Sequence, residues 1–169
     1  MGAFEQLFYK HQGRVYSIAS RMMNNEEDAM DLTQEIFART YQKIDKFSFS
    51  SAFSTWLYRL AVNMCIDELR KRKRSVNTKP LEEAVLQVDS NTPEDYAISK
   101  DKERQVWDAI NSLKEKERAI IILKDIEGLS YKEISEVLKC SLGRVKSRLH
   151  EARQKLKVIL ESKAELWAD

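Results

Sequence analysis

The sequence LSYKEISEVLKCSLGRVKSRLHEARQKLK, residues 129–157, predicts two helices separated by a short turn. Ser130 followed by Glu133 has the pattern of a capping box, which begins a short helix. A second serine, Ser141, is placed to cap a longer helix whose apolar side chains recur at helical spacing. A short helix, a turn of about three residues and a longer helix together predict a helix-turn-helix.

The longer helix has one apolar face and one polar, basic face. Its inward positions are Val145, Leu149, Ala152 and Leu156. Outward positions near its start suit the DNA major groove, because Arg bonds guanine bidentately and Lys neutralises phosphate. The candidate DNA-reading residues are Ser141, Arg144, Lys146, Ser147, Arg148, His150 and Glu151. A solvated helix face is the alternative, but the two caps and the short turn favour DNA contact because they specify the bihelical geometry.

Composition narrows the class of protein. The 169 residues are 43% hydrophobic and 33% charged with only 4 glycines and 2 prolines, which favours an all-α globular fold over a turn-rich β fold. Cys65 and Cys140 have no CxxC spacing and no neighbouring His, so neither a zinc site nor a disulfide framework is expected. The sequence shows no signal-peptide pattern and no apolar run long enough for a membrane span. We expect a cytoplasmic protein without metal or cofactor.

Charge is distributed unevenly along the chain. Residues 1–75 carry 12 basic and 9 acidic side chains, residues 76–99 carry 1 and 5, and residues 100–169 carry 16 and 13. Both prolines fall in the acidic middle segment, which has little periodicity. We therefore expect two small helical domains, residues 1–75 and 100–169, joined by an acidic flexible linker over residues 76–99, with the helix-turn-helix in the second domain.

Residues 53–74, FSTWLYRLAVNMCIDELRKRKR, predict a long helix that is aromatic at its start and basic at its end. A serine-rich loop containing Phe47 and Phe49 precedes it. Aromatic rings beside cations suit single-stranded nucleic acid, because bases stack on rings while Lys and Arg follow the backbone. For Trp56 the alternative is a place in the core, and for the basic run it is simple solvation.

Residues 26–37, EEDAMDLTQEIF, place Asp28, Asp31 and Glu35 on one face of a helix. Carboxylates in this arrangement can serve general acid–base catalysis or bind a hard metal ion. Neither role fits, because no His, glycine-rich phosphate loop or second carboxylate cluster accompanies them. An acidic face that binds a protein partner is favoured over a merely solvated one.

Taken together and in this order, three segments resemble a bacterial RNA polymerase sigma factor of the sigma-70 family, in its extracytoplasmic-function (ECF) group. The segments are residues 31–37 (DLTQEIF), residues 53–74 and residues 128–156 (GLSYKEISEVLKCSLGRVKSRLHEARQKL). The resemblance implies a subunit that binds core polymerase, recognises two promoter elements and helps to open the duplex, and that is not an enzyme.

The resemblance also implies roles for individual residues. The residues that would bind the β′ clamp helices of core polymerase are Asp28, Asp31, Gln34, Glu35 and Phe37. Those that would capture and melt the minus-10 promoter element are Phe47, Ser48, Phe49, Phe53, Ser54, Trp56, Arg59, Asn63, Asp67 and Arg70. Residues 141–151 would read the minus-35 element, and the polymerase β subunit would supply a further contact. Many members are held inactive by a membrane-bound anti-sigma factor, so a partner of this kind is expected.

Two positions depart from the pattern of the family. Ala52 stands where many members have a basic residue, and Glu151 stands where Arg is common. A carboxylate at residue 151 can accept a hydrogen bond from cytosine N4 or can point away from DNA. The alternative function, a self-sufficient helix-turn-helix regulator, needs a dimerisation surface or effector pocket in residues 1–99, and the sequence indicates neither. A small helical enzyme is a third class, and it lacks a nucleophile–base pair or metal set.

Overall fold

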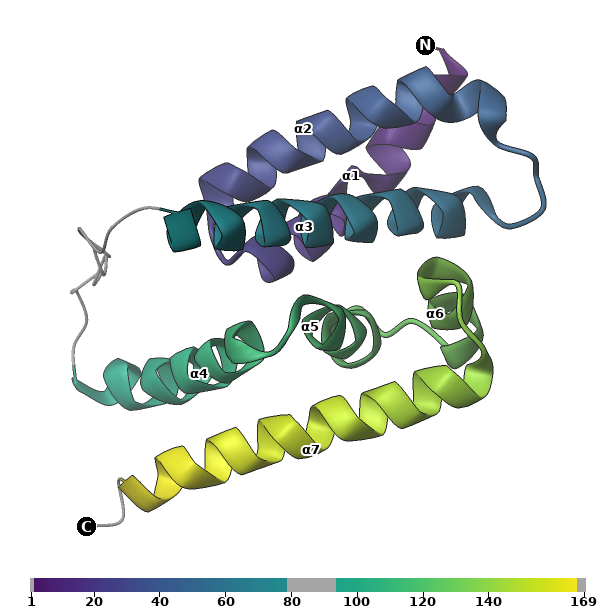
Figure 1. Ribbon diagram of the computed structural model, residues 1–169. Coiled ribbons are helices and arrows are strands. Elements are labelled where there is room, and N and C mark those ends of the chain that lie inside the picture. Colours follow the sequence, from purple (N-terminus) through teal and green to yellow (C-terminus); the bar gives the residue numbers. More distant parts are fainter. Residues whose placement is uncertain (1, 79–93, 167–169) are drawn as a thin grey trace.

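The computed structural model describes residues 2–78 and 94–166, and within these ranges it contains helices and no strand. The N-terminal bundle consists of α1 (Ala3–Met23), α2 (Glu26–Lys43), the 3₁₀ turn η1 (Ile44–Lys46) and α3 (Phe53–Thr78). The C-terminal bundle consists of α4 (Glu94–Ser112), α5 (Glu115–Ile121), the π-helical turn η2 (Ile122–Ile126), α6 (Tyr131–Leu138) and α7 (Leu142–Leu166). One bundle lies against the other (Figure 1). The prediction of an all-α fold with two small helical units is confirmed.

Local sequence explains how the N-terminal bundle turns from α1 to α2. Asn24 ends α1 in the left-handed conformation, with φ 53°, which Asn tolerates better than most residues. The side chain of Asn25 then accepts a hydrogen bond of 3.0 Å from the Asp28 amide and begins α2. The helices bury the apolar side chains of Val15, Ile18, Met22, Ala29, Leu32 and Ile36.

The helices extend further into the middle of the chain than the sequence pattern indicated. α3 continues to Thr78 and α4 begins at Glu94, so both enter the range 76–99 predicted as linker. Pro80 follows α3 by two residues and Pro93 directly precedes α4, and proline is a frequent boundary because it disfavours helical backbone at the residue before it. The remaining part of the predicted linker, residues 79–93, lies outside the described residues.

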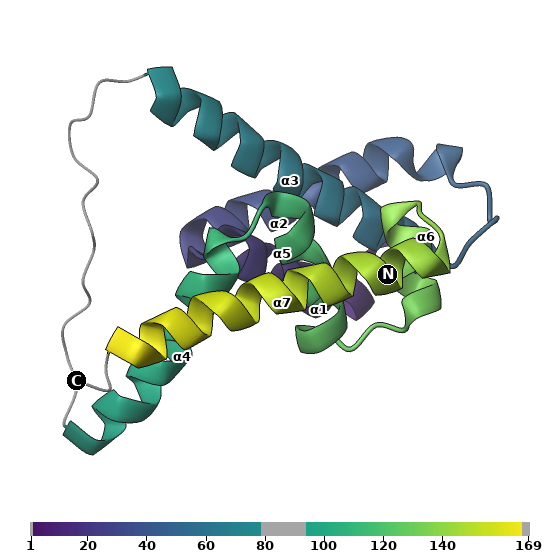
Figure 2. The ribbon, with the colours of Figure 1, turned by 60° about the horizontal axis from the view of Figure 1, so that its bottom comes forward.

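The helix-turn-helix is built by the predicted caps. The hydroxyl of Ser130 accepts a hydrogen bond of 3.1 Å from the Glu133 amide and begins α6. Lys139 ends α6 in the left-handed conformation, with φ 51°, and the hydroxyl of Ser141 accepts a hydrogen bond of 3.2 Å from the Arg144 amide at the start of α7. The inward face of α7 is buried at Val145, Leu149 and Ala152 and partly buried at Leu156. Figure 2 shows α6 beside the first turns of α7.

A continuous cluster of buried apolar side chains runs through both bundles. Cys65 is fully buried in this cluster, and burial raises the pKa of its thiol to about 12. The thiol is therefore protonated at neutral pH, and Cys65 acts as a small hydrophobic side chain. No helix in the two described ranges is long and apolar enough to cross a bilayer.

Candidate nucleic-acid interface

An aromatic platform stands at the start of α3. The ring of Phe47 lies 4.7 Å from that of Phe49, 5.7 Å from that of Phe53 and 5.5 Å from that of Trp56, measured between centroids. Trp56 is half-buried on this platform, so it belongs partly to the packing and partly to the surface. Phe49 is 84% exposed and has φ 59°, which is unusual for a bulky residue and needs support from the surrounding loop. The ring of Phe49 therefore projects into solvent from a group of aromatic rings that pack against one another.

The polar members of the predicted minus-10 set are in different environments. Ser48 and Ser54 are exposed and half-buried, and the hydroxyls of Ser48 and Ser50 lie 2.9 Å apart. On α3, exposed positions recur at helical spacing at Asn63, Asp67 and Arg70. Arg59 lies on the same helix and donates two hydrogen bonds to the backbone carbonyl of Glu136 in α6.

The predicted minus-35 residues gather on the exposed side of α7. Arg144, Ser147, Arg148 and Glu151 follow one another at spacings of three and four; Arg148 is half-buried and the other three are exposed. Ser141 caps the helix, while Lys146 and His150 are exposed on its flank. The Lys146 ammonium lies 5.8 Å from the centre of the Tyr131 ring, which positions it beside α6. This is a helix face with two guanidinium groups, one hydroxyl and one carboxylate available to base edges and phosphates.

Glu151 shares its helix face with Arg148, one turn earlier. Neither side chain forms an ion pair among the described residues, so the carboxylate is not neutralised within the protein. By contrast, the next arginine on α7, Arg153, is held by two hydrogen bonds of 3.1 Å and 2.5 Å to Asp125. Arg153 thus has a structural partner, whereas Arg148 has no ion-pair partner among the described residues.

The predicted acidic face of α2 divides into three environments. Asp31, Gln34 and Glu35 are exposed, whereas Asp28 is half-buried and accepts a hydrogen bond of 2.6 Å from Arg72, which lowers the pKa of its carboxyl. Phe37 is buried, with its ring edge-on to Phe8 at 4.6 Å, so it supports α2 from inside the bundle.

Two apolar side chains of α2 were missed as surface residues. Met30 is 55% exposed and Tyr41 is 65% exposed. Met30 directly precedes the exposed Asp31, and Tyr41 lies near the end of the same helix. A mixed apolar and acidic surface suits a protein partner better than a wholly solvated one. The helical periodicity of the sequence did not predict their exposure, because Tyr and Met side chains fit either the apolar or the polar face of an amphipathic helix.

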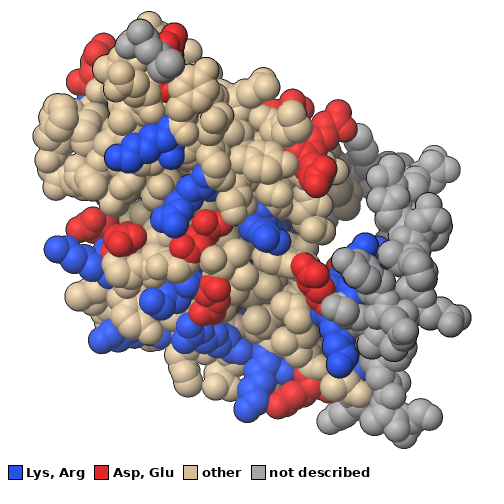
Figure 3. Space-filling view, turned by 180° about the vertical axis from the view of Figure 1, so that it is seen from behind, with Lys and Arg blue, Asp and Glu red and all other residues tan. Residues whose placement is uncertain are grey.

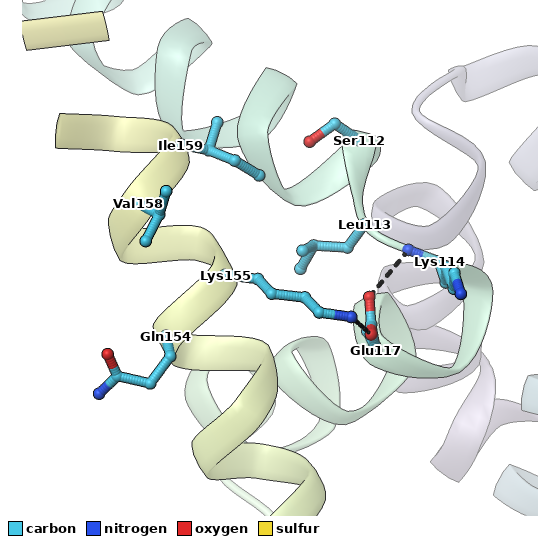
Figure 4. Close-up of a pocket in the computed structure, with 8 residues that line it drawn as sticks. All are labelled: Ser112, Leu113, Lys114, Glu117, Gln154, Lys155, Val158 and Ile159. Atoms are coloured by element: carbon cyan, nitrogen blue, oxygen red, sulfur yellow. Dashed lines mark hydrogen bonds and ion pairs between the residues drawn. The ribbon is translucent and has the colours of Figure 1, made fainter. Parts of the chain in front are cut away.

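A hollow of about 490 Å³ lies between α7 and the junction of α4 with α5 (Figure 4). Leu113, Val158 and Ile159 contribute its apolar wall, and Lys155 reaches across to pair with Glu117. Among the described residues no group of three or more His, Cys, Asp or Glu side chains is arranged to hold a metal ion.

Comparison with known proteins identifies two family regions along the chain. Residues 7–75 match the family Sigma-70 region 2, and residues 103–156 match Sigma-70, region 4. The chain is 36% identical over 163 residues to the ECF RNA polymerase sigma factor SigW of Bacillus subtilis, covering 92% of this chain and 87% of SigW. It is 34% identical over 160 residues to the ECF RNA polymerase sigma-E factor of Escherichia coli K12, covering 90% and 83%.

The chain belongs to the ECF group of sigma-70 family RNA polymerase sigma factors. As a sigma factor, it binds core polymerase and directs promoter-specific initiation of transcription.

Two solved structures share the fold of this sigma factor. CnrH, solved in complex with the cytosolic domain of CnrY, gives a TM-score of 0.68 at 26% identity over 95% of this chain and 88% of CnrH. The sigma factor RpoE, solved with the anti-sigma factor NepR from Bartonella quintana, gives 0.70 at 24% identity over 95% and 98%.

Proposed function

We propose that this sigma factor divides promoter recognition between its two bundles. Residues 1–75 form the domain for core binding and the minus-10 element, residues 100–169 form the domain for the minus-35 element, and residues 76–99 connect them. The observation that carries this proposal is the pairing of an exposed aromatic platform on one bundle with a basic helix-turn-helix face on the other.

On the N-terminal bundle, Phe49 is the side chain best placed to accept an unstacked base of the minus-10 element. Its ring projects into solvent while Phe47, Phe53 and Trp56 hold the loop from below. Base–aromatic stacking contributes about 1–3 kcal/mol per base. Asn63, Asp67 and Arg70 would continue the contact along α3.

On the C-terminal bundle, Arg144, Ser147, Arg148 and Glu151 form the face that would read the minus-35 element in the major groove. Ser141 and the N-terminal amides of α7 would approach the phosphates, with Lys146 and His150 beside them. Glu151 is the residue of this face that selects for a base donor, because a carboxylate accepts a hydrogen bond from cytosine N4.

The exposed carboxylates of α2, with Met30 and Tyr41, form the surface that we assign to the β′ clamp helices, and a second contact is made with the β subunit. The protein works as a specificity subunit without a catalytic activity of its own, in the cytoplasm. An anti-sigma factor is its second protein partner, as NepR is for RpoE.

Reconstitution with core polymerase tests this function. Core polymerase with this protein should give discrete run-off transcripts from a pool of genomic fragments of the source organism, and core polymerase alone should give none. Core polymerase that stays inactive on every fragment would contradict the proposal. Tight, site-specific binding of duplex DNA by the free protein, unchanged by core polymerase, would instead indicate a self-sufficient helix-turn-helix regulator.

A further inference from the structure

The basic last turns of α3 hold cations in different environments. Arg72 is bonded to two carboxylates: its Nη1 donates a hydrogen bond of 2.6 Å to Asp28 in α2, and its Nε donates one of 3.2 Å to Glu68, one turn earlier in α3. Arg70 and Lys71 are exposed and form no ion pair among the described residues. Figure 3 shows basic and acidic side chains next to one another across one face of the molecule, so each cation has to be assigned to its own partner.

Arg72 lies on the side of α3 opposite to the one that would contact DNA. The exposed residues of the DNA side, Asn63, Asp67 and Arg70, lie within about 60° of one another around the helix axis. Arg72 lies about 180° from Asn63 on the same scale, toward the start of α2. It can therefore influence a DNA contact of Arg70 only through the position of the helix.

The acceptor, Asp28, belongs to the first turn of α2 and is itself fixed. Its amide donates a hydrogen bond of 3.0 Å to the side chain of Asn25, and its carboxylate lies at the positive end of the helix dipole. Figure 1 shows the start of α2 and the last turns of α3 at the same end of the bundle. The ion pair thus connects the helix that would bind core polymerase to the basic end of the helix that would bind DNA.

This contact distinguishes Asp28 from the next carboxylate of α2. The side chain of Asp28 is 30% exposed and one of its oxygens is bonded to Arg72, whereas Asp31 is exposed and forms no ion pair among the described residues. A cation of a protein partner would have to share Asp28 with Arg72, and it would find Asp31 unoccupied. Because Arg72 holds Glu68 as well, the contact is a small network, and a network stabilises more than an isolated exposed pair.

We propose that Arg72 is a positioning residue for the minus-10 element, and that Asp28 acts through Arg72 and not by contact with core polymerase. The inference rests on the proposed function of the N-terminal bundle. Residues 70–76 are all exposed, so the end of α3 has little burial to hold it. The Asp28–Arg72 link fixes these turns before DNA arrives, so that Arg70 and Lys71 bind phosphates without the entropic cost of ordering the helix.

Asp28→Asn is the most informative variant, because two effects of opposite sign meet in it. Removal of an anion from the bundle strengthens nonspecific attraction to DNA phosphates, whereas loss of the link weakens the minus-10 contact. The affinity of holoenzyme, formed with saturating sigma factor, is measured for a template with a premelted minus-10 region. We expect this affinity to fall about threefold, the scale of a partly exposed ion pair. Unchanged or tighter binding would overturn the proposal.

Arg72→Gln should produce the same loss. The double variant Asp28→Asn/Arg72→Gln should lose no more than either single variant, because all three remove one link, and additive losses would contradict this. The matched control is Arg39→Gln, which removes an exposed arginine that pairs with Glu35 on α2 at 3.5 Å. It should leave the affinity for the premelted template unchanged; an equal loss would assign the effect to net charge and overturn the proposal.

The affinity for core polymerase separates positioning from direct contact. Each variant competes with fluorescently labelled wild-type sigma factor for core polymerase. Asp28→Asn should compete as well as the wild type, whereas Asp31→Asn should compete several-fold less well, because its carboxylate is exposed and unpaired among the described residues. Equal weakening by the two variants would show that Asp28 contacts core polymerase itself, against the proposal.

An NMR titration of the free, full-length chain tests the link without polymerase or DNA. Arg72 lowers the pKa of the Asp28 carboxyl, and this pKa should rise in Arg72→Gln because the cation that lowers it is lost. An identical pKa in the two chains would overturn the link. The titration also distinguishes two failures, since a wild-type holoenzyme that binds no promoter would contradict the proposed function and leave the Asp28–Arg72 link to be decided by the pKa.

Discussion

At the scale of single residues, exposure and existing partners separate the side chains that are available to DNA from those that hold the fold. Phe49 projects from its loop, whereas Phe37, on the neighbouring helix α2, is buried against Phe8. Arg148 has no carboxylate partner among the described residues, whereas Arg153, five positions later on α7, is fixed by Asp125. Residue type alone does not make these distinctions.

Phe49→Ala should weaken promoter opening without weakening the fold. The ring is 84% exposed, so its removal costs little burial, while loss of one base stack should cost about 1–3 kcal/mol in binding of the melted strand. Binding of the holoenzyme to a template with a premelted minus-10 region measures the effect. Phe53→Ala is the comparison, because that ring packs against Phe47 and Trp56 and its loss should lower the stability as well. A Phe49→Ala holoenzyme with wild-type affinity for the melted template would remove Phe49 from the site.

Arg148→Ala should reduce minus-35 recognition by about 1–3 kcal/mol if the guanidinium bonds a base. Selection of promoters from a randomised minus-35 library by the holoenzyme measures both the loss and the relaxed preference. Arg153→Ala removes an arginine of the same helix that is paired with Asp125, and it should leave the selected sequence unchanged. Identical sequences selected by the Arg148→Ala variant and the wild type would exclude Arg148 from base reading.

At the scale of elements, the helix-turn-helix depends on caps that are local in the sequence. The serines before α6 and α7 each accept a hydrogen bond from the backbone amide three residues later, so both helices begin where the sequence indicates. The turn between them is closed by Lys139 in a left-handed conformation. The orientation of α7 relative to α6 therefore follows from a few residues around the turn.

Ser130→Ala should lower the free energy of unfolding by about 1 kcal/mol, because an amide at the start of α6 loses its acceptor. Urea unfolding measures this as a lower midpoint with an unchanged slope. Ser135→Ala is the matched control: its hydroxyl bonds the Lys132 carbonyl inside α6, and alanine is the better helix former there, so stability should be unchanged or slightly higher. Equal midpoints for Ser130→Ala and wild type would show that the cap contributes nothing.

At the scale of the whole molecule, buried polar groups make stability depend on pH and on the contact between bundles. His11 is 8% exposed, its Nδ1 lies 3.4 Å from the Tyr58 hydroxyl, and burial, with Lys10 and Arg14 nearby, lowers its pKa. Asp28 and Glu115 have lowered pKa values because Arg72 and Lys73 bond their carboxylates. These groups act in different ranges of pH, the histidine first as the solution is acidified.

The free energy of unfolding should fall as the pH decreases below about 6.5, the usual pKa of histidine. In that range the unfolded chain binds a proton at His11 that the folded chain does not, so acid favours unfolding, and the loss continues down to the lowered pKa of the folded state. Urea unfolding between pH 8 and pH 5 measures this slope, and His11→Gln should flatten it. His150→Gln, which leaves His11 in place, should keep the slope, and a His11→Gln slope equal to wild type would assign it to other groups.

The sequence by itself determined most of the helices and the helix-turn-helix with both of its serine caps. These features follow from contacts between residues at most one or two helical turns apart, and periodicity and capping patterns record such contacts directly. The buried position of Phe37 and the exposure of Met30 and Tyr41 were decided by packing, because amphipathic side chains fit more than one environment.

Only the tertiary structure decided how the two bundles meet. Arg118 bonds a carbonyl 96 residues away, and Arg59 bonds one 77 residues away, and both acceptors are backbone atoms that every residue possesses. No residue pattern marks such an acceptor in advance, since it becomes available only where a helix ends and another surface approaches it. The sequence therefore specified the helices of the two bundles, and the fold specified that Arg59 and Arg118 join the bundles.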